Sequence, residues 1–164
     1  MKLMITPTAA AKGFAFAPAC EADYPEYLNI KREGFRKYVD EYYGGWVEDV
    51  QIKMNHDVFM KTLKQSCFVK VLLGGETVGF FGCDEQEDAI AGITLQLTAA
   101  AQNQGLGSCF LSYVTGLARQ TGKPASLKVF KSNPAQGLYA RFGFEPCGET
   151  FSHILLRYDP EIRS

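Results

Sequence analysis

The stretch "AAAQNQGLGSCFLSYVTGLA", Ala99–Ala118, joins a glycine-containing turn to a helical pattern. Gly105 and Gly107 are poor residues for a helix interior, where each costs up to about 1 kcal/mol relative to alanine. Apolar residues recur behind them at the spacing of an amphipathic helix, namely Leu106, Phe110, Val114 and Leu117. The two glycines therefore belong to the first helical turn, whose backbone N–H groups have no acceptor within the helix. Such a turn suits an anion held close to the main chain.

Two common phosphate-binding turns do not fit this stretch. A Walker P-loop needs a lysine directly after its last glycine, but Ser108 follows Gly107. A dinucleotide-binding turn needs a small residue three positions after its second glycine, and Phe110 stands there. The pattern that remains is Gln102-x-x-Gly105-x-Gly107.

Composition restricts the class of protein. At 164 residues, with 46% hydrophobic and 21% charged residues, the chain fits a single globular domain over 1–164. Seventeen basic and eighteen acidic residues give a net charge of −1, without the basic runs of a nucleic-acid binder. No apolar run approaches the ~20 residues of a membrane span. We therefore expect neither nucleic acid nor a membrane as a partner.

Cysteine and histidine usage bears on redox compartment and metals. Five scattered cysteines without CxxC spacing indicate buried thiols in a reducing compartment, not a disulfide framework or a zinc site. Only two histidines are present, so no histidine-rich metal centre is expected. The expected location is the cytoplasm, and the oligomeric state stays open, with a homodimer as one option.

Periodicity and turn residues divide the chain into strands and helices. The expected strands are 14–17, 67–73, 77–83, 89–98, 125–130 and 151–159, and the expected helices are 24–43, 47–64, 105–121 and 134–142. This order predicts an α+β domain whose mixed, largely antiparallel sheet is flanked by helices. Asp23, with Glu26 three residues later, predicts a capping box for the first helix. Asn133 is the expected N-cap of the last helix, and Gly143 its C-terminal stop.

A second stretch, "LKVFKSNPAQGLYARFGFEPCGE" (127–149), accompanies the glycine turn at a characteristic separation. Together the two resemble the signatures of the GNAT acetyltransferase superfamily, and the resemblance covers about residues 14–158. The second signature is matched at Asn133, Leu138, Tyr139, Gly143 and Phe144. Two positions depart from the usual pattern, since Asn103 replaces a frequent glycine and Ala99-Ala100 a frequent Pro-Glu. Asparagine tolerates left-handed backbone angles, so the turn is expected to survive.

The resemblance implies a GNAT-like acyl-CoA N-acyltransferase fold with acetyl-CoA as cosubstrate and no metal. It implies a pyrophosphate site on the backbone of Gln102, Asn103, Gln104, Gly105, Leu106, Gly107 and Ser108. It also implies that strand 93–97 splays from strand 127–130 and pairs with the pantetheine arm. The remaining coenzyme contacts are expected from Leu95, Gln96, Leu97, Asn133, Ala135 and Tyr139, with the Leu97 amide as a donor to the acetyl oxygen.

Acetyl transfer to an amine needs a proton donor for the leaving thiolate and a base for the attacking nitrogen. Tyr139 is the expected donor, since a phenol stays protonated at neutral pH; the alternative is packing beneath "FGF". His153 is the expected base, with Glu33, Glu149 or a water relay left open and a purely structural strand histidine as the alternative. His56, next to Asp57, is interpreted as structural.

Aromatic residues between the first two helices predict an acceptor wall made of Tyr42, Tyr43 and Trp46, with core packing as the alternative. Aromatic faces attract cations, and four nearby carboxylates suggest attraction of a protonated amine: Asp40, Glu41, Glu48 and Asp49. The sequence thus predicts an N-acetyltransferase that moves the acetyl group of acetyl-CoA directly to a primary amine of a small molecule. A protein N-terminal or lysine acetyltransferase and a catalytically silent acyl-CoA sensor remain alternatives.

Overall fold

A computed structural model describes residues 2–163 and contains one seven-stranded sheet in the order β1-β2-β3-β4-β5-β7-β6. Its strands are β1 (Phe14–Pro18), β2 (Cys67–Leu73), β3 (Glu76–Glu85), β4 (Ile90–Leu97), β5 (Ala125–Phe130), β6 (Glu145–Glu149) and β7 (His153–Tyr158). Every neighbouring pair is antiparallel except β4 and β5. The predicted α+β class, with a mixed and largely antiparallel sheet, is confirmed.

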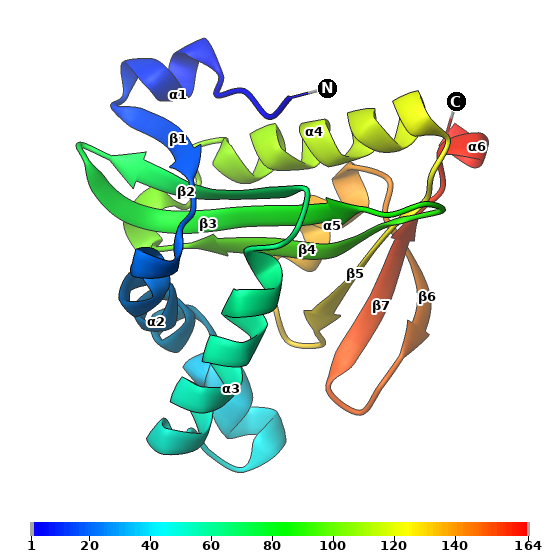
Figure 1. Cartoon of the computed structure of the whole chain (residues 1–164). Helices are drawn as coiled ribbons and strands as arrows, with labels where there is room; N and C mark the ends of the chain where they lie inside the picture. Colours follow the sequence, from blue (N-terminus) through cyan, green and yellow to red (C-terminus); the bar gives the residue numbers. More distant parts are fainter. Residues whose placement is uncertain (1, 164) are drawn as a thin grey trace.

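Helices cover both faces of the sheet (Figure 1). They are α1 (Pro7–Ala11), α2 (Tyr24–Tyr43), α3 (Glu48–Thr62), α4 (Leu106–Thr121), α5 (Gln136–Arg141) and α6 (Pro160–Arg163), with 3-10 turns η1 (Glu21–Asp23) and η2 (Ala99–Ala101). Helix α4 lies along one face, and α2 with α3 lies on the other. Each face therefore has its own apolar core.

Strand β3 illustrates how one strand serves both cores. Phe80 and Phe81 are fully buried neighbours, and successive strand side chains point to opposite faces. Phe81 stacks on Phe110 of α4, with ring centroids 4.7 Å apart. Phe80 contacts Tyr27 of α2 at 5.4 Å. The apolar run of β3 thus anchors helices on both sides of the sheet.

Strands β4 and β5 separate soon after they meet. Ile90 and Ala125 are the one residue pair in register between them, and the Ile90 N–H donates to Pro124 O at 2.8 Å. Beyond this pair the two strands diverge visibly in Figure 1. The expected splay is confirmed, and it leaves a gap in the middle of the sheet.

Helices α1 and α6 and strand β6 were not predicted from the sequence. Helix α1 is short, with Pro7 in its first turn and the Thr6 hydroxyl accepting from Ala9 N at 3.3 Å. Strand β6 lies at the sheet edge with all five residues exposed, and its register shifts at Pro146. A strand exposed on both faces carries no alternation of apolar and polar residues, so its sequence gives no strand signal.

The predicted capping box of α2 is wrong. Asp23 stands at the N-cap position with helical backbone angles and makes no capping hydrogen bond. Its carboxylate instead accepts from Cys20 N at 2.8 Å and from Lys70 Nζ at 3.0 Å. A carboxylate committed to η1 and to β2 is not available to the first turn of α2.

The last predicted helix begins later than expected. Ala135, not Asn133, is the N-cap of α5, while Asn133 Oδ1 accepts from Ala135 N at 2.9 Å in the preceding turn. Gly143 has φ +92° directly after the helix end, which confirms it as the predicted stop.

Candidate active site

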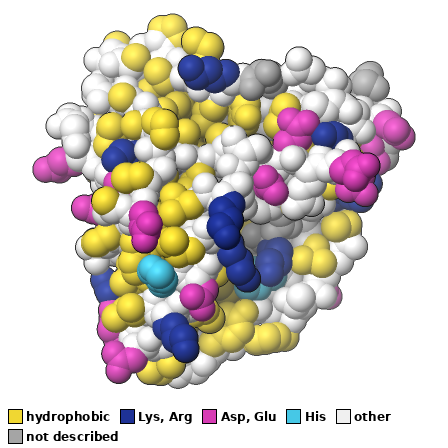
Figure 2. All heavy atoms as spheres, in the orientation of Figure 1, with side chains coloured by type: hydrophobic (Ala, Val, Ile, Leu, Met, Phe, Trp, Pro, Cys, Tyr) yellow, Lys and Arg dark blue, Asp and Glu magenta, His cyan; other side chains and the backbone are white. Residues whose placement is uncertain are grey.

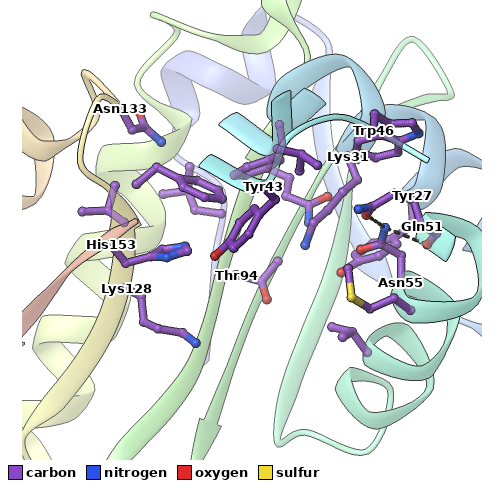
Figure 3. Close-up of a pocket in the computed structure, with 18 of the residues that line it drawn as sticks. Tyr27, Lys31, Tyr43, Trp46, Gln51, Asn55, Thr94, Lys128, Asn133 and His153 are labelled. Carbon is purple, nitrogen blue, oxygen red and sulfur yellow. Dashed lines mark hydrogen bonds between the residues drawn. The ribbon is translucent and has the colours of Figure 1, made fainter. Parts of the chain in front are cut away.

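A cavity of about 800 Å³ lies between the sheet and the helices α2 and α3 (Figure 3). Its floor is formed by Thr94 and Gln96 of β4, Lys128 and Phe130 of β5, and His153 of β7. Helix α2 contributes Tyr27, Lys31, Phe35, Val39 and Tyr43, and α3 contributes Val50, Gln51, Met54, Asn55 and Val58. Gly45, Trp46 and Val47 close the cavity between the helices, and Ile93, Leu95, Val129, Asn133, Ala135 and Tyr139 complete it. The cavity thus borders the gap between β4 and β5, since residues of both strands line it.

His153 is held by a chain of hydrogen bonds. Its Nδ1 lies 2.7 Å from Ser152 Oγ, which lies 2.8 Å from the Tyr43 hydroxyl. Its ring packs on Phe130, with centroids 4.1 Å apart. With Nδ1 occupied by Ser152, the Nε2 atom is the nitrogen left for the cavity.

The environment of His153 favours its neutral form. Burial lowers the pKa of His153 below 6.5, and the nearby charge of Lys128 lowers this pKa further. When Nδ1–H donates to Ser152 Oγ, the neutral ring presents an Nε2 lone pair to the cavity. This is the protonation state that a base requires at neutral pH.

Tyr139 stands where the cavity meets the main core. Its side chain is 7% exposed and its ring contacts Phe144 edge to face at 6.1 Å. Burial raises the pKa of Tyr139 to about 12. No hydrogen-bond partner for its hydroxyl is present in the described part of the chain. The predicted packing role and a role in the cavity are therefore compatible.

The glycine turn before α4 has the backbone expected of it. Gly105 is the N-cap with φ +80°, and Asn103 has φ +59° in the left-handed region that glycine and asparagine tolerate. Among residues 2–163, none accepts a hydrogen bond from the backbone N–H groups of 103–108. A Cβ on Gly107 would lie 3.1 Å from Leu138 and 3.8 Å from Leu95. The turn therefore presents free donors directly beside β4 and α5.

The hydrogen bonding of β4 divides its residues between two roles. Thr98 N donates to Val78 O at 2.9 Å. The alternation of an antiparallel ladder then turns the Gln96 backbone toward β3 and the Leu95 and Leu97 N–H groups toward the gap. The Gln96 side chain is 4% exposed and faces α2 and α3. Of the three β4 residues predicted to contact the coenzyme, Gln96 therefore differs from Leu95 and Leu97, because its side chain lies on the side of the sheet covered by α2 and α3.

The other predicted coenzyme residues cluster around the turn. Gln102 Nε2 donates to Leu97 O at 3.1 Å, and Gln104 Oε1 accepts from Lys12 at 3.1 Å. Leu106 is buried in the main core and Ser108 is half-buried. Asn133 and Ala135 line the cavity near Tyr139.

The predicted acceptor aromatics separate into two groups. Tyr43 and Trp46 line the cavity. Tyr42 lies outside it, where its ring stacks on Phe130 at 5.7 Å and its hydroxyl donates to Ser132 Oγ at 3.2 Å.

The carboxylates expected to attract an amine do not line the cavity. Glu48 pairs with Arg32 and accepts from Trp46 Nε1 at 2.8 Å. Asp40 accepts from Trp46 N at 2.9 Å, and Glu41 from Ser132 Oγ at 2.6 Å. Asp49 is an exposed residue in the first turn of α3. Of the four, Asp40 and Glu48 therefore hold Trp46, a residue of the cavity wall, from outside.

The alternative bases also lie elsewhere. Glu33 is exposed on α2, and Glu149 pairs with Lys131 at 3.1 Å at the sheet edge. His56 packs edge to face on Tyr24 at 4.9 Å, outside the cavity.

Sequence reasoning missed several cavity residues, among them Lys31, Gln51, Asn55 and Lys128, and it also missed Ser152, which contacts His153 without lining the cavity. Lys31 had a signal, because it is a lysine at helical spacing between Tyr27 and Phe35 on an otherwise aromatic face. Ser152 had no such signal, since its role depends on a hydrogen bond with Tyr43, which lies more than a hundred positions away in the sequence.

None of the helices within residues 2–163 is long and apolar enough to span a bilayer. In this same part of the chain, no group of three or more His, Cys, Asp or Glu side chains is placed to hold a metal ion.

With the gap, the glycine turn and the cavity described, comparison with known families identifies the class of protein. The model of the acetyltransferase (GNAT) family matches residues 31–144. The chain belongs to this family. No curated protein sequence matches the chain.

Solved structures of low sequence identity share the fold. The PaiA N-acetyltransferase of Thermoplasma acidophilum in complex with coenzyme A has a TM-score of 0.69 at 14% identity, over 89% of this chain and 98% of that one. The ribosomal-protein-S18-alanine N-acetyltransferase of Escherichia coli has a TM-score of 0.63 at 17% identity, over 89% and 93%. A phosphinothricin acetyltransferase of Sinorhizobium meliloti, in complex with AcCoA, has a TM-score of 0.64 at 16% identity, over 90% and 88%.

Proposed function

We propose that this protein transfers the acetyl group of acetyl-CoA directly to a primary amine of a small molecule. The observation that carries the proposal is the continuity of the site. Free N–H donors of the glycine turn lie beside Leu95, and Leu95 lines the same cavity as Tyr139 and His153. An extended acyl donor entering at α4 would therefore deliver its acyl end to a buried hydroxyl and a neutral imidazole.

The residues around the gap fit acetyl-CoA. The N–H groups of 103–108 suit its pyrophosphate, since a helix N-terminus with unpaired donors favours an anion. The N–H groups of Leu95 and Leu97 face the gap and suit an extended amide-containing arm. Acetyl-CoA would supply a thioester, an acyl donor that requires no covalent intermediate on the protein.

His153 acts as the base in this proposal. Its Nε2 accepts a proton from the amine nitrogen, and Ser152 keeps the ring oriented while Nδ1 retains its own proton. The lowered pKa of His153 keeps this nitrogen unprotonated at neutral pH.

Tyr139 serves mainly as a hydrogen-bond donor. With its pKa raised to about 12, it is a weaker acid than a thiol, whose pKa is about 8.5. Full proton transfer from Tyr139 to a thiolate is therefore uphill, whereas donation of a hydrogen bond to developing negative charge is favourable. This refines the proton-donor role predicted from the sequence.

The compartment and acceptor class also remain proposals. The five cysteines are free thiols, which supports a reducing location such as the cytoplasm. The prediction that they are buried is wrong for Cys20 and Cys147, which are exposed. Acidic and basic side chains are interspersed on the face shown in Figure 2, which supports a small acceptor over a nucleic acid.

Titration calorimetry tests the acyl donor. We expect acetyl-CoA to bind and ATP and NAD not to bind. Gly107→Glu should abolish acetyl-CoA binding, because a carboxylate would enter the turn where Leu138 and Leu95 already lie close. Gly34→Glu is the matched control, since Gly34 is a helical glycine of α2 with open space around it. NAD binding as tight as that of acetyl-CoA would contradict the proposal.

A thiol-release assay with a panel of small amines and peptide N-termini tests the transfer. Turnover with a small amine is the expected result. Turnover only with peptides would favour the protein acetyltransferase instead, and acetyl-CoA binding without turnover on any acceptor would favour the silent sensor.

A further inference from the structure

We propose that the acceptor carries an anionic group besides its amine, and that Lys31 binds this group and sets acceptor specificity. This inference rests on the proposed acetyl transfer and names the chemical class of its acceptor.

The charge of the cavity is the first observation. Its charged or titratable lining residues other than tyrosine are Lys31, Lys128 and His153, and neither Asp nor Glu lines it within the described chain. A simple cationic amine would therefore meet like charge and no counter-ion. An acceptor with a negative group would complement the cavity, which is how charged sites select partners.

Lys31 itself is the second observation. It is half-buried on α2, with Nζ 5.9 Å from the Tyr27 ring centroid and 5.3 Å from that of Phe35. Within residues 2–163, no carboxylate lies within salt-bridge distance of it. Burial lowers the pKa of Lys31 to about 8, so most molecules still carry the charge at neutral pH. A partly desolvated ammonium group without a counter-ion is unfavourable until an anion pairs with it.

Unpartnered amide groups supply the third observation. Asn55 Nδ2 donates to Gln51 Oε1 at 3.1 Å and to Gln51 O at 2.9 Å, and this leaves Gln51 Nε2 without a partner in the described chain. Gln51 is 8% exposed and Asn55 is 3% exposed. Gln96, 4% exposed, has no hydrogen-bond partner for Oε1. Gln96 Oε1 is therefore a buried acceptor that the protein itself does not satisfy, and Gln51 Nε2 is a donor left free for a ligand.

The arrangement assigns the two ends of the acceptor. In Figure 3, Lys31 and the Gln51–Asn55 pair lie on the side of the cavity formed by α2 and α3, and His153 lies on the opposite side. The amine thus belongs near His153, and the anion belongs near Lys31 and Gln51 Nε2. Gln96 Oε1, which also lines the cavity, is an acceptor for an N–H of the same molecule.

The α3 wall indicates the body of the acceptor. Four apolar residues face the cavity at helical spacing and remain largely exposed: Val47 at 59%, Val50 at 57%, Met54 at 50% and Val58 at 43%. Covering such a stripe favours an apolar substituent. The acceptor class is therefore a small amine with an anionic group and an apolar body.

Paired acceptors test the inference. Apolar amino acids, with their phosphonate analogues, are compared with the corresponding neutral amides in wild type, Lys31→Met and Lys31→Arg. We expect wild type to prefer the anionic member, and Lys31→Met to lower kcat/KM for it about 10- to 100-fold, the size of a lost hydrogen bond to a charged group. The loss on the neutral amide should be clearly smaller than the loss on the anionic member, and Lys31→Arg should retain the preference.

Lys37→Met is the matched control, because Lys37 lies on the same helix, over the ring of Tyr38, but outside the cavity. Comparing carboxylates with phosphonates identifies which anion the site takes. A wild-type preference for neutral amides, or an equal loss on both acceptors in Lys31→Met, would overturn the inference.

A binding readout separates this inference from the proposed function. Calorimetry with N-acetyl amino acids and N-acetyl amino acid amides reports on the anion site without turnover. Selective binding of the acids that Lys31→Met removes supports the anion site even if no amine is acetylated, in which case the proposed function alone fails. Equal binding of acids and amides by wild type contradicts the anion site even if transfer proceeds.

Discussion

The Tyr43–Ser152–His153 chain determines which nitrogen of His153 is available to a substrate. Ser152 is 1% exposed, so its hydroxyl is held by Tyr43 and His153 and not by solvent. Ser152 is a positioning residue, since its hydroxyl acts through the imidazole.

The first prediction at this site concerns pH. Because the pKa of His153 is lowered, its neutral form dominates down to a pH below 6.5, and kcat/KM should rise with pH through that lower value. His153→Gln should remove this inflection and lower kcat/KM about 10²- to 10⁴-fold, as for a lost general base. Ser152→Ala should keep the inflection and lower kcat without changing acetyl-CoA affinity. An unchanged pH profile in His153→Gln would assign the base to another group.

Tyr139 provides a separate test of leaving-group stabilisation. Tyr139→Phe keeps the packing against Phe144 but removes the hydroxyl. Since Tyr139 donates a hydrogen bond to developing charge, we expect kcat to fall about 10²-fold, as when one such donor is lost. Acetyl-CoA affinity from calorimetry should change little. Full activity of the variant would leave Tyr139 with only its packing role.

Helix α2 is attached to the sheet through the 3-10 turn that precedes it. Asp23 joins Cys20 N to Lys70 of β2, and the side chains of Asp23 and Lys70 are 10% and 23% exposed. Burial alone would raise the pKa of Asp23, but hydrogen bonds from Cys20 and Lys70 outweigh it and hold the pKa below 3.8. The beginning of the helix that carries Lys31 thus depends on one paired carboxylate.

Substitution of Asp23 should therefore affect stability. We expect Asp23→Asn to lower the free energy of unfolding by about 1–3 kcal/mol at neutral pH, because it weakens charged hydrogen bonds and leaves Lys70 unpaired. A carboxylate with a lowered folded pKa stabilises the fold above its unfolded pKa and loses this effect as pH falls through the folded value. Urea unfolding should show the difference between wild type and variant shrinking toward pH 3. Glu21→Gln, an exposed substitution in the same turn, should be nearly neutral, and an equal effect there would contradict the explanation.

Individual elements differ in how well their sequences predict them. Helix α4 and its turn were predicted closely, because apolar periodicity and two glycines are local signals. Strand β6 was missed because both of its faces are exposed. The start of α5 shifted by two residues because Asn133 forms a turn of its own before the helix.

At the scale of the whole protein, the gap between β4 and β5 connects two sites that lie on opposite faces of the sheet. The turn before α4 belongs to one face of the sheet, and the cavity under α2 and α3 belongs to the other (Figure 1). The gap between β4 and β5 connects them, and Leu95 contributes to both. In the proposed reaction, the acyl donor and the acceptor therefore approach from opposite faces and meet beside Tyr139.

The sequence by itself determined the glycine turn, the helix behind it, the alternation of the central strands and the place of Tyr139 in its helix. These features depend on residues within a few positions of one another, so periodicity and backbone preference reveal them. Only the tertiary structure decided the character of the acceptor cavity. None of the four carboxylates predicted to attract the amine lines the cavity, whereas Lys31 does. A cavity gathers side chains from α2, α3, β4, β5 and β7, and its charge depends on which way each helix and strand is turned against the others. That orientation is set by packing between segments that are far apart in the sequence, so it cannot be predicted from a local sequence pattern.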